Sequence, residues 1–152
     1  MSLMREIYQQ TIIDHGRKPR NFHTLDAPCI AADGQNRSCG DSLRLYTRVV
    51  DEVIEAVSFT GEGCAIAVAS ASLLTEVVSG MRVDDALALF QRFHQAVVAG
   101  EDFEPQNDDE ARLSVFLGVQ AYPARVKCAT LAWQTLIAVL ENPESPITVS
   151  TE

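Results

Sequence analysis

Three cysteines in this sequence stand next to residues that favour tight turns or helix starts. Cys39 precedes a Gly-Asp pair, Cys64 follows a Gly-Glu-Gly triplet, and Cys128 comes shortly after Pro123. Glycine permits sharp backbone turns, and proline suits the first turn of a helix. Loop and helix-end positions leave thiols accessible, so these three cysteines are candidates for thiol or metal chemistry.

The predicted helix starts also favour the ionised form of these thiols. A helix N-terminus carries partial positive charge and lowers a thiol pKa, which favours the thiolates of Cys64 and Cys128. Arg125 precedes Cys128 on the same helical face and would stabilise its anion. The alternative for each cysteine taken singly is a small buried hydrophobic side chain, and for Arg125 a solvated helix residue.

Asp41 adds a carboxylate oxygen to the three sulfur atoms. Zinc takes four tetrahedral ligands of these types. In a reducing compartment, cysteines more often indicate metal or thiol chemistry than disulfides. The spacing is not a repeated CxxC pair, so the spacing alone does not select zinc over a chance arrangement.

Length and composition restrict the class of protein. A chain of 152 residues is the size of one domain, so we expect a single domain over 1–152. The net charge of −9 argues against nucleic acid as the main partner. There is no apolar stretch long enough for a membrane span and no signal peptide, so we expect a cytoplasmic protein without a membrane partner. The second methionine, Met4, indicates that residues 1–3 are foreign to the native chain.

Hydrophobic periodicity predicts a small sheet near the N-terminal helix. A helix is expected over 5–15, and an extended stretch over 29–32 leads into a polar turn at 33–36. Residues 42–50 alternate apolar and polar side chains, and 53–60 runs back after a short turn. The pattern predicts an antiparallel hairpin and three strands in all.

Helical patterns dominate the rest of the chain. We expect helices over 66–77, over 83–98 and from 123 to about 142, with an acidic loop at 101–110. The tail, 143–152, is expected to be disordered. The fold class is therefore α+β: a small three-stranded antiparallel sheet with helices packed on one face.

Several stretches match one known family in the same order along the chain. They are 8–21, with Asp14-His15 and Pro19-Arg20-Asn21, then Cys39-Gly40-Asp41, then 61–66 with 69–72, and last 122–133. On these motifs the chain resembles the U-type iron–sulfur scaffold family, IscU-like (NifU N-terminal type) in fold and closest to its SufU branch. This resemblance implies the fold and the function of an iron–sulfur cluster assembly protein.

Two details favour the SufU branch. IscU-like proteins carry histidine directly before the third ligand cysteine, where this chain has Lys127. The stretch 83–110 resembles an insertion that SufU-like proteins carry between the second and third ligand cysteines. Cys29 matches no ligand of the family and is interpreted as structural.

The resemblance implies that Cys39, Asp41, Cys64 and Cys128 hold Zn²⁺. It further implies a sulfur acceptor that takes persulfide sulfur from a pyridoxal-phosphate-dependent cysteine desulfurase (SufS-like), as part of the iron–sulfur assembly machinery and not as a stand-alone enzyme. Cys39 is the candidate acceptor because a loop residue swings away easily. Cys128 is the second candidate, and Arg125 would stabilise the freed thiolate.

Other functions remain compatible with the same residues. The ligands also suit a scaffold that builds and passes on a transient [2Fe–2S] cluster. A closed four-ligand site is likewise typical of a structural zinc domain that binds proteins. A thiol–disulfide redox protein would need two cysteines close in sequence, which this chain lacks. With three cysteines and an aspartate available, the metal requires none of the histidines, His15, His23 and His94.

Overall fold

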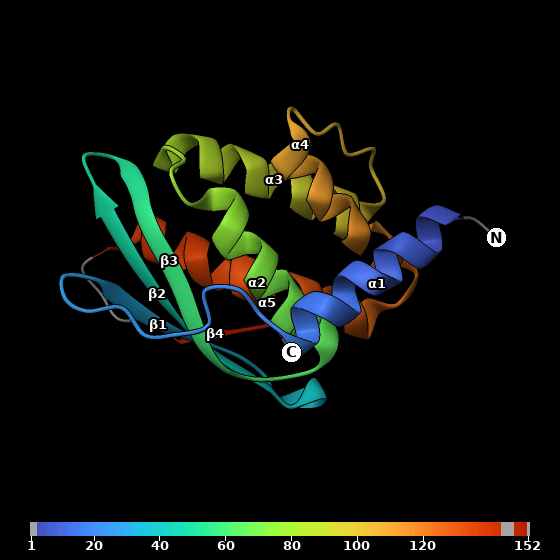
Figure 1. Ribbon diagram of the computed structural model, residues 1–152, viewed down its shortest axis with the longest axis horizontal. Helices are drawn as coiled ribbons and strands as arrows, with labels where there is room; N and C mark the ends of the chain where they lie inside the picture. The colour runs from blue at the N-terminus through green and yellow to red at the C-terminus, as the bar shows by residue number, and fades with distance from the viewer. Residues whose placement is uncertain (1–2, 144–147, 152) are drawn as a thin grey trace.

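Four strands form one mixed sheet with helices on one side of it in the computed structural model, which describes residues 3–143 and 148–151 (Figure 1). The strand order is β3-β2-β1-β4. The strands are β1 (Ile30–Asn36), β2 (Asp41–Val50), β3 (Val53–Glu62) and β4 (Thr148–Ser150). β1, β2 and β3 are antiparallel neighbours, and β4 adds to β1 in parallel.

The hairpin of β2 and β3 forms as the alternating pattern predicts. Asp41, Leu43, Leu45 and Thr47 are buried, while the residues between them are exposed or half-buried. Alternate side chains of a strand point to opposite faces, so β2 presents one face to the helices and the other outward. Asp41 therefore points into the protein from the first position of its strand.

Two helices lie directly on the sheet, and the others pack against them (Figure 1). α2 (Ala65–Val78) contacts β3, and α5 (Pro123–Glu141) contacts β1 and β2. α1 (Leu3–Arg17) packs along α2, and α3 (Val83–Ala99) packs on α5. The α+β class and the predicted helices are confirmed.

Aromatic side chains fix the position of α5 in the core. Trp133 is fully buried, and its ring centroid lies 5.2 Å from that of Phe93 on α3. Phe93 also contacts Phe116 edge-on at 6.3 Å. Large buried rings of this kind contribute strongly to stability. They anchor the helix whose first turns carry Cys128.

The sheet has four strands, not the predicted three, and is mixed, not purely antiparallel. The predicted turn at 33–36 is wrong: these polar residues complete β1, and Asp33 to Asn36 pair with β2. Burial of Gly34 and Asn36 and the pairing with both neighbours override the local turn preference.

The tail, predicted to be disordered, contains a strand in the structure. Residues 148–150 form β4 because they pair with 33–35, a contact between distant parts of the chain that local periodicity does not reveal. Residues 144–147 and 152 of that tail lie outside the described residues. Of the segment 1–3 interpreted as foreign, residues 1–2 also lie outside them, and Leu3 is the first residue of α1.

The acidic stretch 101–110 contains the start of a short helix. Asn107 caps α4 (Asp108–Ala111) by accepting a 2.9 Å hydrogen bond from the backbone N–H of Glu110. The Glu110 carboxylate is buried and pairs with Arg92 at 2.9 Å. The 3₁₀ helices η1 (Arg37–Cys39) and η2 (Arg112–Ala121) complete the elements. No described helix has the length and apolar character needed to cross a bilayer.

Candidate metal centre

Cys39 and Asp41 lie on either side of a tight turn between two elements. Cys39 ends η1, and Gly40 adopts a left-handed conformation with φ of 72° before β2 begins at Asp41. Side chains other than glycine rarely adopt this conformation. The Cys-Gly-Asp sequence therefore places a half-buried thiol and a buried carboxylate next to each other.

Cys64 is the N-cap of α2 and is half-buried. Its thiol makes no capping hydrogen bond. Its backbone N–H instead donates a 2.8 Å hydrogen bond to Oδ1 of Asp41. The backbone at Gly63 comes so close to Asp41 that a Cβ atom there would lie 2.7 Å from Oδ1. Asp41 and the start of α2 are thus held together.

Cys128 lies in the second turn of α5 and is 0% exposed. Its thiol donates to the backbone oxygen of Ala124 at 3.5 Å. The side-chain amide of Asn36, on β1, donates to its sulfur at 3.7 Å. Cys128 is therefore the most deeply placed of the predicted donors.

The ligand atoms of Cys39, Asp41 and Cys128 all lie within 4.8 Å of one another. Donors that share a tetrahedral zinc ion with bonds near 2.3 Å lie roughly 3.8 Å apart, so this spacing suits a common ion. Cys64 is not a member of this close group, but its side chain is near enough to Cys128 to help raise the pKa of that thiol. Three of the predicted donors, from η1, β2 and α5, thus meet in one place, and Cys64 at the start of α2 lies beside them.

The electrostatics of the cluster fit a bound cation. One carboxylate oxygen of Asp41, Oδ2, is buried and has no hydrogen-bond partner among the described residues. Burial raises the pKa of Cys128, and hydrogen bonds with Asp41, Cys39 and Cys64 raise it further. A buried orphan oxygen and a crowded set of acidic groups are unfavourable without positive charge.

The expected lowering of the Cys128 pKa by the helix start is therefore not found. The thiol is fully buried and surrounded by groups that become negative, and these effects outweigh the helix dipole. Sequence reasoning considered the helix end but had no measure of burial.

Arg125 is exposed, and the charges of all three cluster cysteines act on it. Its pKa is raised, chiefly by the charges of Cys64 and Cys128, then by a hydrogen bond to Cys128 and by the charge of Cys39. Arg125 thus presents a permanent positive charge at the solvent side of the cluster.

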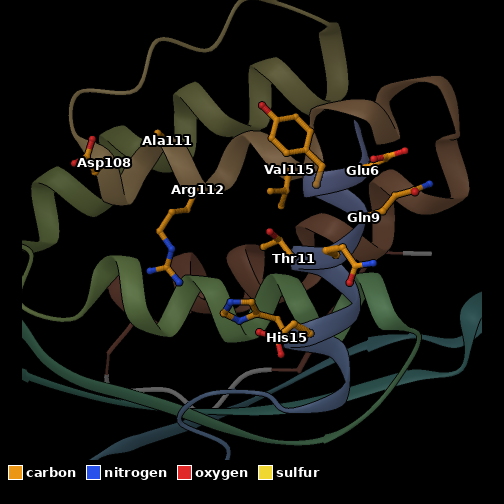
Figure 2. A pocket seen from close by; sticks show the side chains of 11 residues that line it. Glu6, Gln9, Thr11, His15, Asp108, Ala111, Arg112 and Val115 are labelled. Carbon is orange, nitrogen blue, oxygen red and sulfur yellow. The ribbon is translucent and has the colours of Figure 1, made fainter. Parts of the chain in front are cut away.

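The histidines and Cys29 lie outside the donor cluster. His23 is exposed, its Nδ1 lying 2.8 Å from the backbone oxygen of Thr24, and the ring of His94 lies tilted against that of Phe90 with centroids 5.2 Å apart. Cys29 donates to the backbone oxygen of Leu25 at 3.6 Å. His15 is buried at the edge of a groove of about 1180 Å³ between α1, α4 and η2, where Arg112 points toward it (Figure 2).

Sequence reasoning missed Asn36 and the contact role of Gly63. The polar residues 33–36 favour a turn at Asn36, although the spacing of Ala32, Gly34 and Asn36 is that of one strand face. That period was the signal that could have placed the amide inside the protein.

Comparison with known proteins gives the family. Residues 7–129 match the family described as "NifU-like N terminal domain". The zinc-dependent sulfurtransferase SufU of Bacillus subtilis is 36% identical over 130 residues, 86% of each chain. The IscU scaffold protein of Thermotoga maritima is 35% identical over 147 residues, covering 95% of this chain and 99% of the relative.

A solved structure agrees with this assignment. A proposed iron–sulfur cluster assembly scaffold protein for the SUF system from Fervidobacterium islandicum AW-1 superimposes with a TM-score of 0.80 at 30% identity. The match covers 90% of this chain and 98% of that one. Similar identities to SufU and IscU relatives do not separate the two branches. The chain belongs to the NifU N-terminal (SufU/IscU) family of iron–sulfur cluster assembly proteins.

Proposed function

We propose that the chain is a zinc-binding sulfur acceptor that takes persulfide sulfur from a cysteine desulfurase and relays it to iron–sulfur cluster assembly. The observation that carries the proposal is the meeting of Cys39, Asp41 and Cys128 within 4.8 Å, with Cys64 beside them. The relative from Bacillus subtilis, named a zinc-dependent sulfurtransferase, supports the same function.

The four donors would hold the metal as three sulfurs and one carboxylate oxygen. A bound zinc ion keeps its sulfur ligands deprotonated near neutral pH and restrains them. Asp41 supplies Oδ2, because its other oxygen already accepts the N–H of Cys64. Cys128 is buried within the protein, whereas Cys39 is half-buried and follows a short 3₁₀ helix.

Cys39 is the acceptor in this proposal. Its thiolate attacks the outer sulfur of the persulfide on the desulfurase cysteine, forming a new S–S bond at Cys39. The S–S bond of the donor breaks, and the electron pair leaves with the desulfurase cysteine as a thiolate. The positive charge of Arg125 at the cluster stabilises Cys39 as an anion before attack.

Assembly of a [2Fe–2S] cluster on the same residues is the second candidate. Cysteine thiolates ligate such clusters, and the relative from Thermotoga maritima is named a scaffold protein. Lys127, in place of the histidine of IscU-like proteins, favours sulfur relay over this function.

Two measurements on anaerobically purified protein test the proposal. We expect about one zinc ion per chain, no cluster absorption, and faster turnover of a cognate cysteine desulfurase when the protein is added. Cys39→Ser should lose the stimulation, and the matched control Cys29→Ser, outside the cluster, should keep it. A brown protein with iron and sulfide matching its concentration would favour the scaffold. Unchanged turnover with both wild type and Cys39→Ser would favour a structural zinc domain.

A further inference from the structure

Asn36 is a buried polar side chain at the cluster to which the proposed sulfur transfer assigns no role. It is the last residue of β1 and is 0% exposed. In the sheet register it pairs with Asp41, so the two side chains leave neighbouring strands on the same covered face. Both point toward the first turns of α5.

The amide group of Asn36 makes its hydrogen bond to sulfur. Nδ2 donates to Sγ of Cys128 at 3.7 Å, across 92 positions of sequence. The amide oxygen, Oδ1, is buried without a partner in the part of the chain that the structure describes. An amide buried for stability alone would have hydrogen-bond partners for both its N–H group and its oxygen. Here only the N–H group has one, so we take its contact with the Cys128 sulfur as the role of this side chain.

The N–H of Asn36 matters most when Cys128 is a thiolate. In the thiol form, Cys128 donates its S–H to the backbone oxygen of Ala124. A thiolate has no hydrogen to donate and can only accept, so that bond is lost while the bond from Asn36 is strengthened. Both residues are 0% exposed, so water does not compete for this bond.

Cys39 has a different environment. It is half-buried, and its sulfur lies 4.0 Å from the same oxygen of Ala124. Asn36 makes its sulfur contact with Cys128 and not with Cys39. A hydrogen bond draws electron density from a thiolate and makes it a weaker nucleophile, so the two cysteines differ in reactivity as well as exposure.

We propose that Asn36 is a positioning residue that keeps Cys128 as the retained metal ligand and thereby directs sulfur to Cys39. The inference rests on the proposed function, because it needs a metal-binding sulfur acceptor. In this proposal, the Asn36 amide on β1 determines which of the two candidate cysteines, Cys39 or Cys128, accepts the sulfur.

Cobalt substitution tests the hydrogen bond directly. Co²⁺ takes the same donors as zinc and gives sulfur-to-metal charge-transfer bands that report the electron density on sulfur. Asn36→Leu has a similar volume and no donor. We expect its bands to move to longer wavelength than those of wild type, and its zinc affinity in chelator competition to fall about tenfold or more.

Thr47→Val is the matched control. Thr47 is a fully buried polar residue of the same sheet, its hydroxyl has no partner among the described residues, and valine has its shape. It lies six residues along β2 from Asp41. Its cobalt spectrum should match wild type, which separates a bond to sulfur from a general effect of a buried polar change. Should Asn36→Leu fail to fold, Asn36→Ala removes the donor without adding a charge; the same band shift is expected.

Mass spectrometry then locates the transferred sulfur. After reaction of the zinc-loaded protein with a persulfidated desulfurase, wild type should carry sulfur at Cys39, whereas Asn36→Leu should carry part of it at Cys128. An unshifted spectrum, or sulfur confined to Cys39 in both proteins, would overturn the role of Asn36 and leave the proposed function intact. Failure of wild type to bind cobalt or accept sulfur would instead contradict the proposed function.

Discussion

The backbone N–H of Cys64 donates a 2.8 Å hydrogen bond to Oδ1 of Asp41, 23 positions earlier in the chain. This bond joins the first residue of β2 to the N-cap of α2. The donor is one of the N–H groups that a helix start leaves unsatisfied, and the Asp41 carboxylate accepts its hydrogen bond. Asp41 therefore has a structural oxygen and a second, buried oxygen left for a cation.

Replacing Asp41 should separate these two roles. Asp41→Asn keeps an oxygen for the Cys64 N–H but removes the charge, and Asp41→Ala removes both. We expect zinc affinity to fall in both variants, by at least about tenfold in Asp41→Ala, since a ligand and a contact holding another ligand are lost together. Chelator competition measures the affinity. Unchanged affinity and unchanged sulfur acceptance in Asp41→Ala would remove Asp41 from the site.

Gly63→Ala should weaken metal binding without touching a ligand. The added Cβ would lie 2.7 Å from Oδ1 and 3.3 Å from Cα of Asp41, so the carboxylate must shift. The expected result is a lower zinc affinity with a modest loss of stability, about 1–3 kcal/mol for overpacking of this kind.

Gly118→Ala is the control for this substitution, because a Cβ there meets nothing within 4 Å. It should leave zinc affinity unchanged. If the Gly63→Ala variant bound zinc as wild type does, the carboxylate position would not matter to the metal.

Arg125→Ala should slow sulfur acceptance and spare metal binding. Arg125 is exposed, and its raised pKa records the negative charge of the nearby cysteines. Loss of this charge leaves the attacking thiolate less stabilised, so we expect a several-fold lower rate of persulfide transfer at unchanged zinc content.

Lys127→Ala is the charge-matched control, because Lys127 is an exposed cation next to Cys128. Rates of persulfide transfer in single-turnover experiments compare the two variants. Equal rates would assign the effect to net charge and not to the position of Arg125.

His15 should make folding stability depend on pH below about 6.5. Burial lowers the pKa of His15 from its ordinary value of 6.5, and the charge of Arg20 lowers it further. The unfolded chain then binds a proton at a higher pH than the folded chain does. Stability from neutral, buried His15 is complete above the ordinary pKa and decreases as pH falls below it.

Thermal unfolding of wild type and His15→Gln at a series of pH values checks this. The variant lacks the titrating ring and the 2.7 Å hydrogen bond between Nδ1 and Ser72, so it should be less stable at neutral pH by about 1 kcal/mol. The stability difference should shrink toward acid pH. A difference that stayed constant would show that His15 does not titrate between the two states.

Much of the candidate site could be predicted from the sequence, because its donors occupy positions with strong local signals. Gly40 has the left-handed turn that its residue type permits, and Pro123 begins the helix that carries Cys128. The hairpin of β2 and β3 followed from side-chain alternation, since one face is buried. These features are decided by a few neighbouring residues.

The sequence by itself thus determined the α+β class and the family, and it predicted the donor residues. Only the tertiary structure decided that 148–150 would extend the sheet, that Asn36 would lie against Cys128, and that burial would oppose the Cys128 thiolate. The physical reason is that each of these depends on contacts between segments far apart in the chain. Burial and strand pairing set the free energies of these contacts, and local residue patterns do not encode them.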